Sequence, residues 1–76
     1  MPEEREYGPQ PIDAKMTERA MNNHTLVAAS TEQLTHKMVA KARRGRFLST
    51  PVRMKILRAW NQATGETLTL RDLFNY

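Results

Sequence analysis

The sequence predicts a small all-α protein, a bundle of about five short helices that includes a helix-turn-helix. The chain has 76 residues, a length that suits one hydrophobic core. Apolar residues recur every third or fourth position, the period of helices with one buried face. There is no cysteine, which excludes a disulfide scaffold and a thiolate zinc site. No apolar run approaches the ~18 residues of a membrane helix, so we expect a cytoplasmic protein without a membrane partner.

The chain divides into a predicted flexible tail, residues 1–11, and a single folded domain, residues 12–76. The tail contains few apolar side chains, and its prolines and glycine disfavour regular structure. These residues are Pro2, Gly8, Pro9 and Pro11.

Two helices are expected in the first part of the domain. Asp13 is a candidate N-cap for a helix that reaches about Asn23, where two consecutive asparagines weaken helix propensity. The apolar stripe of this helix comprises Ile12, Met16, Ala20 and Met21. A short second helix is predicted over residues 24–31. Its apolar content is Leu26, Val27, Ala28 and Ala29.

The third helix has distinct start and stop signals. Thr35 begins it, Arg44 ends it, and Gly45 is suited to a left-handed C-cap. At 100° per residue, one side of this helix is apolar and is expected to pack, and the other carries cations. The packing side comprises Leu34, Met38, Val39 and Ala42. The cationic side comprises Lys37, Lys41 and Arg44.

The fourth helix follows a connector, residues 46–48, in which Phe47 or Leu48 is expected to turn inward. Thr50 is the candidate N-cap, Pro51 suits the first helical position, and Gly65 suits the stop. The predicted buried face is Val52, Ile56, Ala59, Trp60 and Ala63, with Leu57 at its margin. The residues predicted to face away are Lys55, Arg58 and Gln62.

Two interpretations apply to the last segment. Thr69 and Asp72 have the spacing of a capping box, which predicts a final helical turn. Its buried candidates are Leu70, Leu73 and Phe74. Residues 66–70 also alternate between polar and apolar, which is typical of a short strand.

The charges are unevenly distributed along the chain. The net charge is +4, yet six of the eight acidic residues precede Gln33 and none lies between Gln33 and Gly65. A basic run of this kind suits a polyanion, because phosphate contacts dominate nucleic-acid affinity, although a solvated surface is the simpler alternative. The basic residues of this run are Lys37, Lys41, Arg43, Arg44, Arg46, Arg53, Lys55 and Arg58.

The residues that catalysis needs are missing. His24 and His36 are twelve positions apart, with no acidic or thiol partner at metal-ligand spacing. Gly8, Gly45 and Gly65 are the only glycines, so the chain contains no glycine-rich phosphate loop. We therefore expect no enzyme, metal or cofactor.

Residues 33–46 resemble the second half of a phage-repressor helix-turn-helix, of the Cro-like, xenobiotic-response-element type. In that frame Ala29 takes the small-residue position of the positioning helix, and an arginine-glycine unit ends the recognition helix. The ending Leu70–Phe74 is also similar to the family's last turn, so the resemblance covers about residues 24–76. The packing positions of the recognition helix are Leu34, Val39 and Ala42.

Two positions depart from this pattern. Gln33 stands where the turn normally has glycine, and a left-handed glutamine costs roughly 1 kcal/mol relative to glycine. Glu32 stands at a normally apolar position. Residues 48–57 also resemble the first core helix of a winged-helix metalloregulator. That fold would need a recognition helix and a wing after Tyr76, so the repressor-like frame fits the length better.

The resemblance implies a non-enzymatic DNA-binding protein, a small transcriptional regulator that inserts the helix 35–44 into the major groove of double-stranded DNA. Without Asn or Gln on the outer face, lysine contacts to guanine or shape-based binding are expected. The alternative is a basic module that docks on an acidic protein partner; RNA is a lesser option, because few aromatic residues remain for base stacking. The sequence leaves the oligomeric state open. The expected DNA contacts are Thr35, His36, Lys37, Ala40, Lys41, Arg43, Arg44, Arg46 and Arg53.

Overall fold

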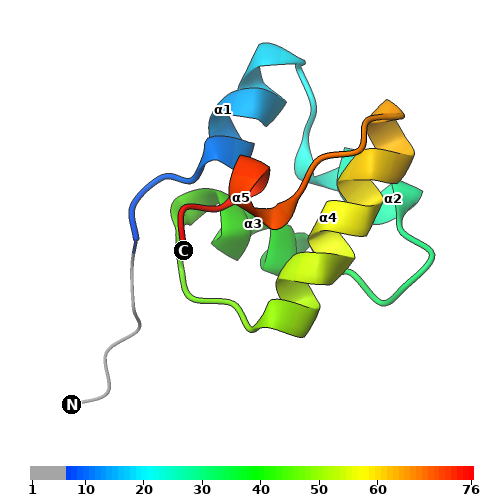
Figure 1. Ribbon diagram of the computed structural model, residues 1–76. Coiled ribbons are helices and arrows are strands. Elements are labelled where there is room, and N and C mark those ends of the chain that lie inside the picture. Colours follow the sequence, from blue (N-terminus) through cyan, green and yellow to red (C-terminus); the bar gives the residue numbers. More distant parts are fainter. Residues whose placement is uncertain (1–6) are drawn as a thin grey trace.

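A computed structural model describes residues 7–76 and shows an all-helical arrangement (Figure 1). The helices are α1 (Pro11–Glu18), α2 (Asn23–Ala29), α3 (His36–Arg44), α4 (Thr50–Thr64) and α5 (Leu70–Leu73). The predicted all-α class, with about five short helices, is therefore confirmed. Residues 66–69 form a connection to α5, so the alternative of a strand over residues 66–70 is wrong. Over the described range, no helix combines the length and the apolar character needed to cross a membrane.

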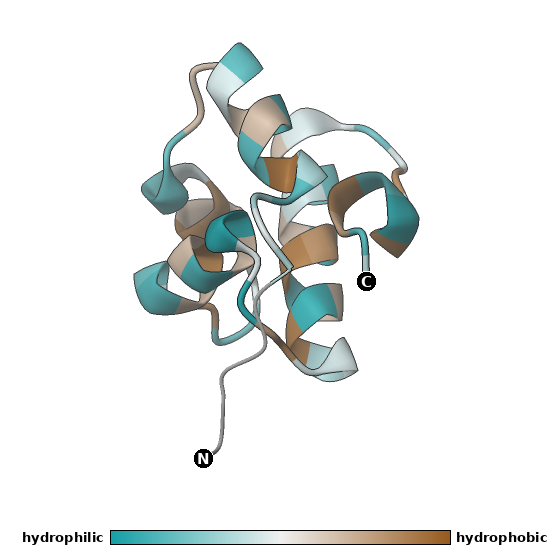
Figure 2. Ribbon diagram, turned by 90° about the vertical axis from the view of Figure 1, so that its left-hand side faces the viewer, coloured by the Kyte–Doolittle hydropathy of each residue, from teal (hydrophilic) through white to brown (hydrophobic). Residues whose placement is uncertain are grey.

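The core lies where the inner faces of all five helices meet. The longest helix, α4, packs against α2, α3 and α5, and α1 packs against α3 and α5. In Figure 1 the short α5 lies between α1 and α4, and Figure 2 shows apolar and polar segments alternating along the helices. The buried apolar residues are Ile12, Met16, Leu26, Leu34, Val39, Ala42, Leu48, Ile56, Leu57, Ala59, Trp60, Leu73 and Phe74.

Local capping explains the boundaries of α3 and α5. The Thr35 hydroxyl accepts a hydrogen bond from the Met38 amide at 3.1 Å, and Gly45 ends α3 with a φ of 86°. Both termini of α3 were thus correctly predicted. The capping box predicted for Thr69 and Asp72 is also present, because the Asp72 carboxylate accepts from the Thr69 amide at 2.7 Å.

The boundaries of α1 differ from the prediction. The helix begins at Pro11 with Gln10 as its N-cap, and Asp13 lies within the first turn. It ends at Glu18, because Ala20 adopts a left-handed φ of 55° that turns the chain toward α2. The sequence pattern did not indicate this turn, since alanine rarely adopts it.

Two details around α4 also need correction. Ser49, rather than Thr50, is the N-cap residue. Ala63, predicted on the buried face, is exposed. The prediction that Phe47 or Leu48 turns inward is confirmed, because Leu48 is buried while Phe47 remains 52% exposed.

Residues 7–10 are packed against the domain, which contradicts the predicted flexible tail for this stretch; residues 1–6 of that prediction lie outside the described residues. The Tyr7 amide donates to the Gly45 carbonyl at 2.8 Å, and the Tyr7 ring stacks on Tyr76 with centroids 4.2 Å apart. The buried Gln10 side chain donates to the Gly8 carbonyl and accepts from the Asn75 amide. Composition could not predict this packing, because Gly45, Asn75 and Tyr76 lie far away in the sequence.

The buried Trp60 has a polar partner at the edge of the core. Its indole Nε1 donates to the Glu66 carboxylate at 2.9 Å. The same carboxylate accepts from Arg19 at 3.0 Å, and the Arg19 guanidinium lies 5.3 Å from the centre of the indole ring. This bond satisfies the single donor of the tryptophan, so Trp60 belongs to the core as expected.

We expect Glu66 to make stability depend on pH. The hydrogen bond from Trp60, supported by Arg19, lowers the pKa of Glu66 below its ordinary value of 4.5. A lowered native pKa gives stability that is present above the ordinary pKa and is lost as the pH falls through the lowered value. Thermal unfolding of wild type and Glu66→Gln should therefore show a stability difference near neutral pH that shrinks in acid. A difference that is constant with pH would contradict this role of the carboxylate.

Candidate nucleic-acid interface

One side of α3 is exposed and carries several cations. Its opposite side is buried through Val39 and Ala42. At 100° per residue, Lys37, Lys41 and Arg44 fall within roughly 60° of one another. Lys37 and Arg44 are exposed and Lys41 is half-buried. We call the following set the α3 face: Lys37, Ala40, Lys41 and Arg44. Thr35 and His36 lie beside it, at the N-terminal end of the helix.

The cations of the α3 face are not neutralised by their neighbours. Among residues 7–76, the side chains of Lys37, Lys41 and Arg44 have no hydrogen-bond or ion-pair partner. The α3 face therefore combines four of the nine residues that the sequence predicted as DNA contacts, and two more, Thr35 and His36, lie beside it at the start of α3. Its positive charge is concentrated on a helix of nine residues, about 13 Å in length.

Arg43, another predicted contact, lies on a different side of α3 and is bonded within the protein. Its Nε donates to the Asp13 carboxylate of α1 at 2.5 Å, and its Nη1 donates to the Asn23 side chain of α2 at 3.0 Å. Arg43 therefore connects three helices and positions α3, rather than presenting its charge outward. The sequence could not show this, because the partners are 30 and 20 residues away.

Arg53 also has an internal role. Its guanidinium donates to the carbonyl oxygens of Leu48 and Tyr76 and to the Thr50 hydroxyl. It lies 4.7 Å from the centre of the Tyr76 ring. Arg53 thus joins the start of α4 to the C-terminal residues, and its phosphate contact stays a prediction.

The connector around Arg46 is held by the same tyrosine. The Tyr76 hydroxyl donates to the Arg46 carbonyl at 3.0 Å and accepts from the Leu48 amide at 3.1 Å. Burial raises the pKa of Tyr76 above its usual 10.0, so the hydroxyl stays protonated and can donate. Arg46 itself is half-buried beside the C-terminal end of α3.

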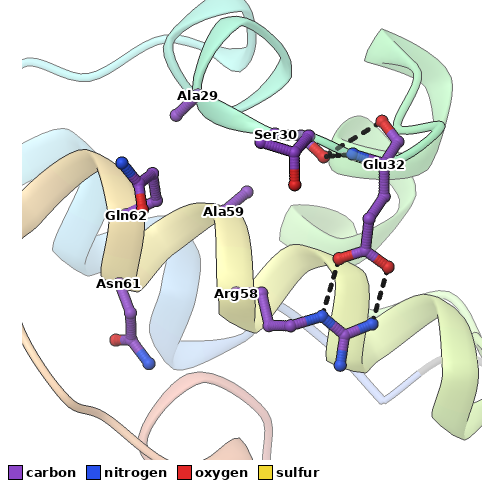
Figure 3. Close-up of a pocket in the computed structure, with 8 residues that line it drawn as sticks. Ala29, Ser30, Glu32, Arg58, Ala59, Asn61 and Gln62 are labelled. Atoms are coloured by element: carbon purple, nitrogen blue, oxygen red, sulfur yellow. Dashed lines mark hydrogen bonds and ion pairs between the residues drawn. The ribbon is translucent and has the colours of Figure 1, made fainter.

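The connection between α2 and α3 is fixed to α4 by an ion pair (Figure 3). Glu32 accepts two hydrogen bonds from Arg58, at 2.6 and 2.7 Å, and these bonds lower the Glu32 pKa. The Glu32 amide also donates to the Ser30 hydroxyl. The pair borders a cleft of about 370 Å³ that Ala59 and Gln62 also line. Glu32, the acid at a normally apolar position of the repressor-like pattern, therefore holds the connection between α2 and α3 against α4.

The turn itself differs from the repressor-like expectation. Six residues separate α2 from α3, which is longer than the usual three- or four-residue turn of a helix-turn-helix. Gln33 is exposed, and Ala20 is the single non-glycine residue with positive φ in the part of the chain that is described. The expected cost of a left-handed glutamine therefore does not arise.

Sequence reasoning missed two features beside the α3 face. The ring of His24, at the start of α2, stacks against His36 with centroids 5.7 Å apart. An open cleft of about 490 Å³ lies between Asp13, Asn23 and Arg44, bordered by Ala40. Neither feature leaves a signal in a sequence pattern, because both depend on how α1 and α2 pack against α3.

Comparisons with protein-family models, with curated proteins and with solved structures found no match.

Proposed function

We propose that this protein is a non-enzymatic DNA-binding protein, a small transcriptional regulator that places α3 in the major groove. The main support is the α3 face, where Lys37, Lys41 and Arg44 share one arc while the opposite side of the helix is buried. Lys37 and Arg44 are exposed on this arc, and Lys41 is half-buried. The major groove, about 12 Å wide, admits one helix, and cations on that helix would displace counterions from the phosphates.

The composition of the α3 face suggests how DNA would be read. Its exposed arc offers lysine and arginine, which pair with guanine O6 and N7, and lacks the asparagine or glutamine that reads adenine. The small Ala40 side chain permits close approach to the bases. Arg43 and Arg53 would support binding indirectly, because their internal bonds position α3 and the start of α4.

Replacing Lys37 and Lys41 together by alanine should weaken duplex binding and leave the melting temperature nearly unchanged. If both lysines contact phosphates, the slope of log affinity against log salt should fall by about 1.8, since each phosphate contact contributes about 0.9. Fluorescence anisotropy with a random-sequence duplex over a salt series measures both quantities.

A charge-matched control distinguishes specific contacts of the α3 face from general electrostatic attraction between a basic protein and DNA. Lys55→Ala with Arg71→Ala removes two cations from α4 and α5 and should change affinity much less. Equal weakening by both double variants, or salt-independent binding by the wild type, would contradict the proposal. Absence of DNA binding combined with recovery of an acidic protein partner would favour a protein-interaction module.

A further inference from the structure

Two imidazole rings from different helices lie together at the edge of the α3 face. His24 is the second residue of α2 and His36 the first residue of α3, and both are exposed. Their ring centroids are 5.7 Å apart, with an interplanar angle of 26°. The packing of α2 against α3 brings them together across twelve positions of sequence, so the separation is a property of the folded chain.

The separation suits a shared metal ion. A transition metal lies about 2.0–2.1 Å from an imidazole nitrogen, so the ring centre lies roughly 3.2 Å from the ion. Two rings on one tetrahedral ion then have centres roughly 5–6 Å apart, a range that includes the observed 5.7 Å. The rings are stacked, so at least one must turn before both in-plane nitrogen lone pairs point to a common ion. Rotation about χ2 is broad for histidine, and both rings are exposed, so this turn is accessible.

We propose that His24 and His36 form a two-imidazole binding site for a divalent transition-metal cation. Imidazole favours copper, nickel and zinc over magnesium or calcium. The observed separation fits tetrahedral Zn²⁺ directly. Cu²⁺ should bind most tightly by the usual order of affinities, with the exposed rings moving about 1 Å closer to reach its square-planar geometry. Solvent would complete the coordination shell, because no group of three or more His, Cys, Asp or Glu in the described range could hold a metal. This inference does not depend on DNA binding.

The surroundings determine the expected strength and specificity of the site. The positive charge of the exposed Lys37, next to His36, repels a metal cation, so we expect the site to bind the cation with moderate affinity. The Thr35 hydroxyl already accepts a hydrogen bond from the Met38 amide.

A bound ion would hold the start of α2 against the start of α3. Because the two rings are adjacent in the folded protein, the ion should bind the folded protein more tightly than the unfolded chain. Added Zn²⁺ should therefore raise the melting temperature of the wild type, and Mg²⁺ at the same concentration should not.

Copper titration of four proteins tests the inference directly. Electron paramagnetic resonance of the wild type with one equivalent of Cu²⁺ should show two coordinated nitrogens, and calorimetry should give one site. His24→Ala and His36→Ala should each bind at least tenfold more weakly, with one coordinated nitrogen at most. Lys37→Ala is the matched control and should bind as tightly as the wild type or more so.

The variants are expected to fold, because both rings are exposed, and circular dichroism without metal checks this. If a variant is unfolded, histidine NMR of the wild type with Zn²⁺ still decides the question. The C–H resonances of His24 and His36 should shift together with one saturation curve. Independent shifts, or single-histidine variants that bind copper as tightly as the wild type, would overturn the inference.

Discussion

Trp60→Ala is expected to leave the protein largely unfolded at 25 °C. Trp60 is fully buried and packs in the cluster that joins α4 to its neighbours. Removing a large aromatic side chain costs about 3–5 kcal/mol, through lost burial and the cavity left behind. A core in a chain of this size rarely supplies more than about 3–5 kcal/mol in total. Urea denaturation followed by far-ultraviolet circular dichroism measures the loss.

Trp60→Phe separates the volume of the ring from its hydrogen bond. Phenylalanine keeps most of the apolar contact but cannot donate to Glu66, so the variant should fold with a stability reduced by about 1–3 kcal/mol. An alanine variant as stable as the phenylalanine variant would show that Trp60 does not organise the core.

Gly45→Ala is expected to destabilise the protein by about 3 kcal/mol. Gly45 has a φ of 86°, and a left-handed conformation costs other residues about 1 kcal/mol. A Cβ atom here would lie 1.8 Å from the Gly8 carbonyl oxygen, so the backbone of residues 7–10 would have to move. That movement disturbs the bond between Tyr7 and Gly45 and the bonds of Gln10, each worth about 1 kcal/mol.

Gly65→Ala is the matched control for this prediction. Gly65 ends α4 with a φ of 76°, and a Cβ atom there would meet nothing within 4 Å. The control should therefore lose only the stability that a left-handed alanine costs, about 1 kcal/mol. Thermal unfolding of both variants compares the two costs. Equal losses would mean that residues 7–10 do not pack against Gly45 in solution.

The helices whose ends carry local signals were the ones that the sequence predicted well. Thr35 and Gly45 limit α3, and Gly65 ends α4, because a side-chain cap or a left-handed glycine acts within one turn of the helix. The end of α1 was missed, since Ala20 is held in its left-handed turn without any such signal.

The α3 face was predictable for a similar reason. The positions of Lys37, Lys41 and Arg44 on one arc follow from the 3.6-residue period alone. The sequence could not distinguish Arg43 and Arg53 from these cations. Nothing in the neighbouring residues indicates that Arg43 bonds to Asp13 or that Arg53 bonds to Tyr76.

The all-α class, the capped ends of α3 and the polarity of its two sides could be predicted from the sequence, since these depend on interactions within a few residues. The packed structure was needed to show which cations are exposed, how residues 7–10 pack over Gly45, and that His24 contacts His36. Those features arise between segments that are distant in the chain, and their geometry depends on how the helices pack.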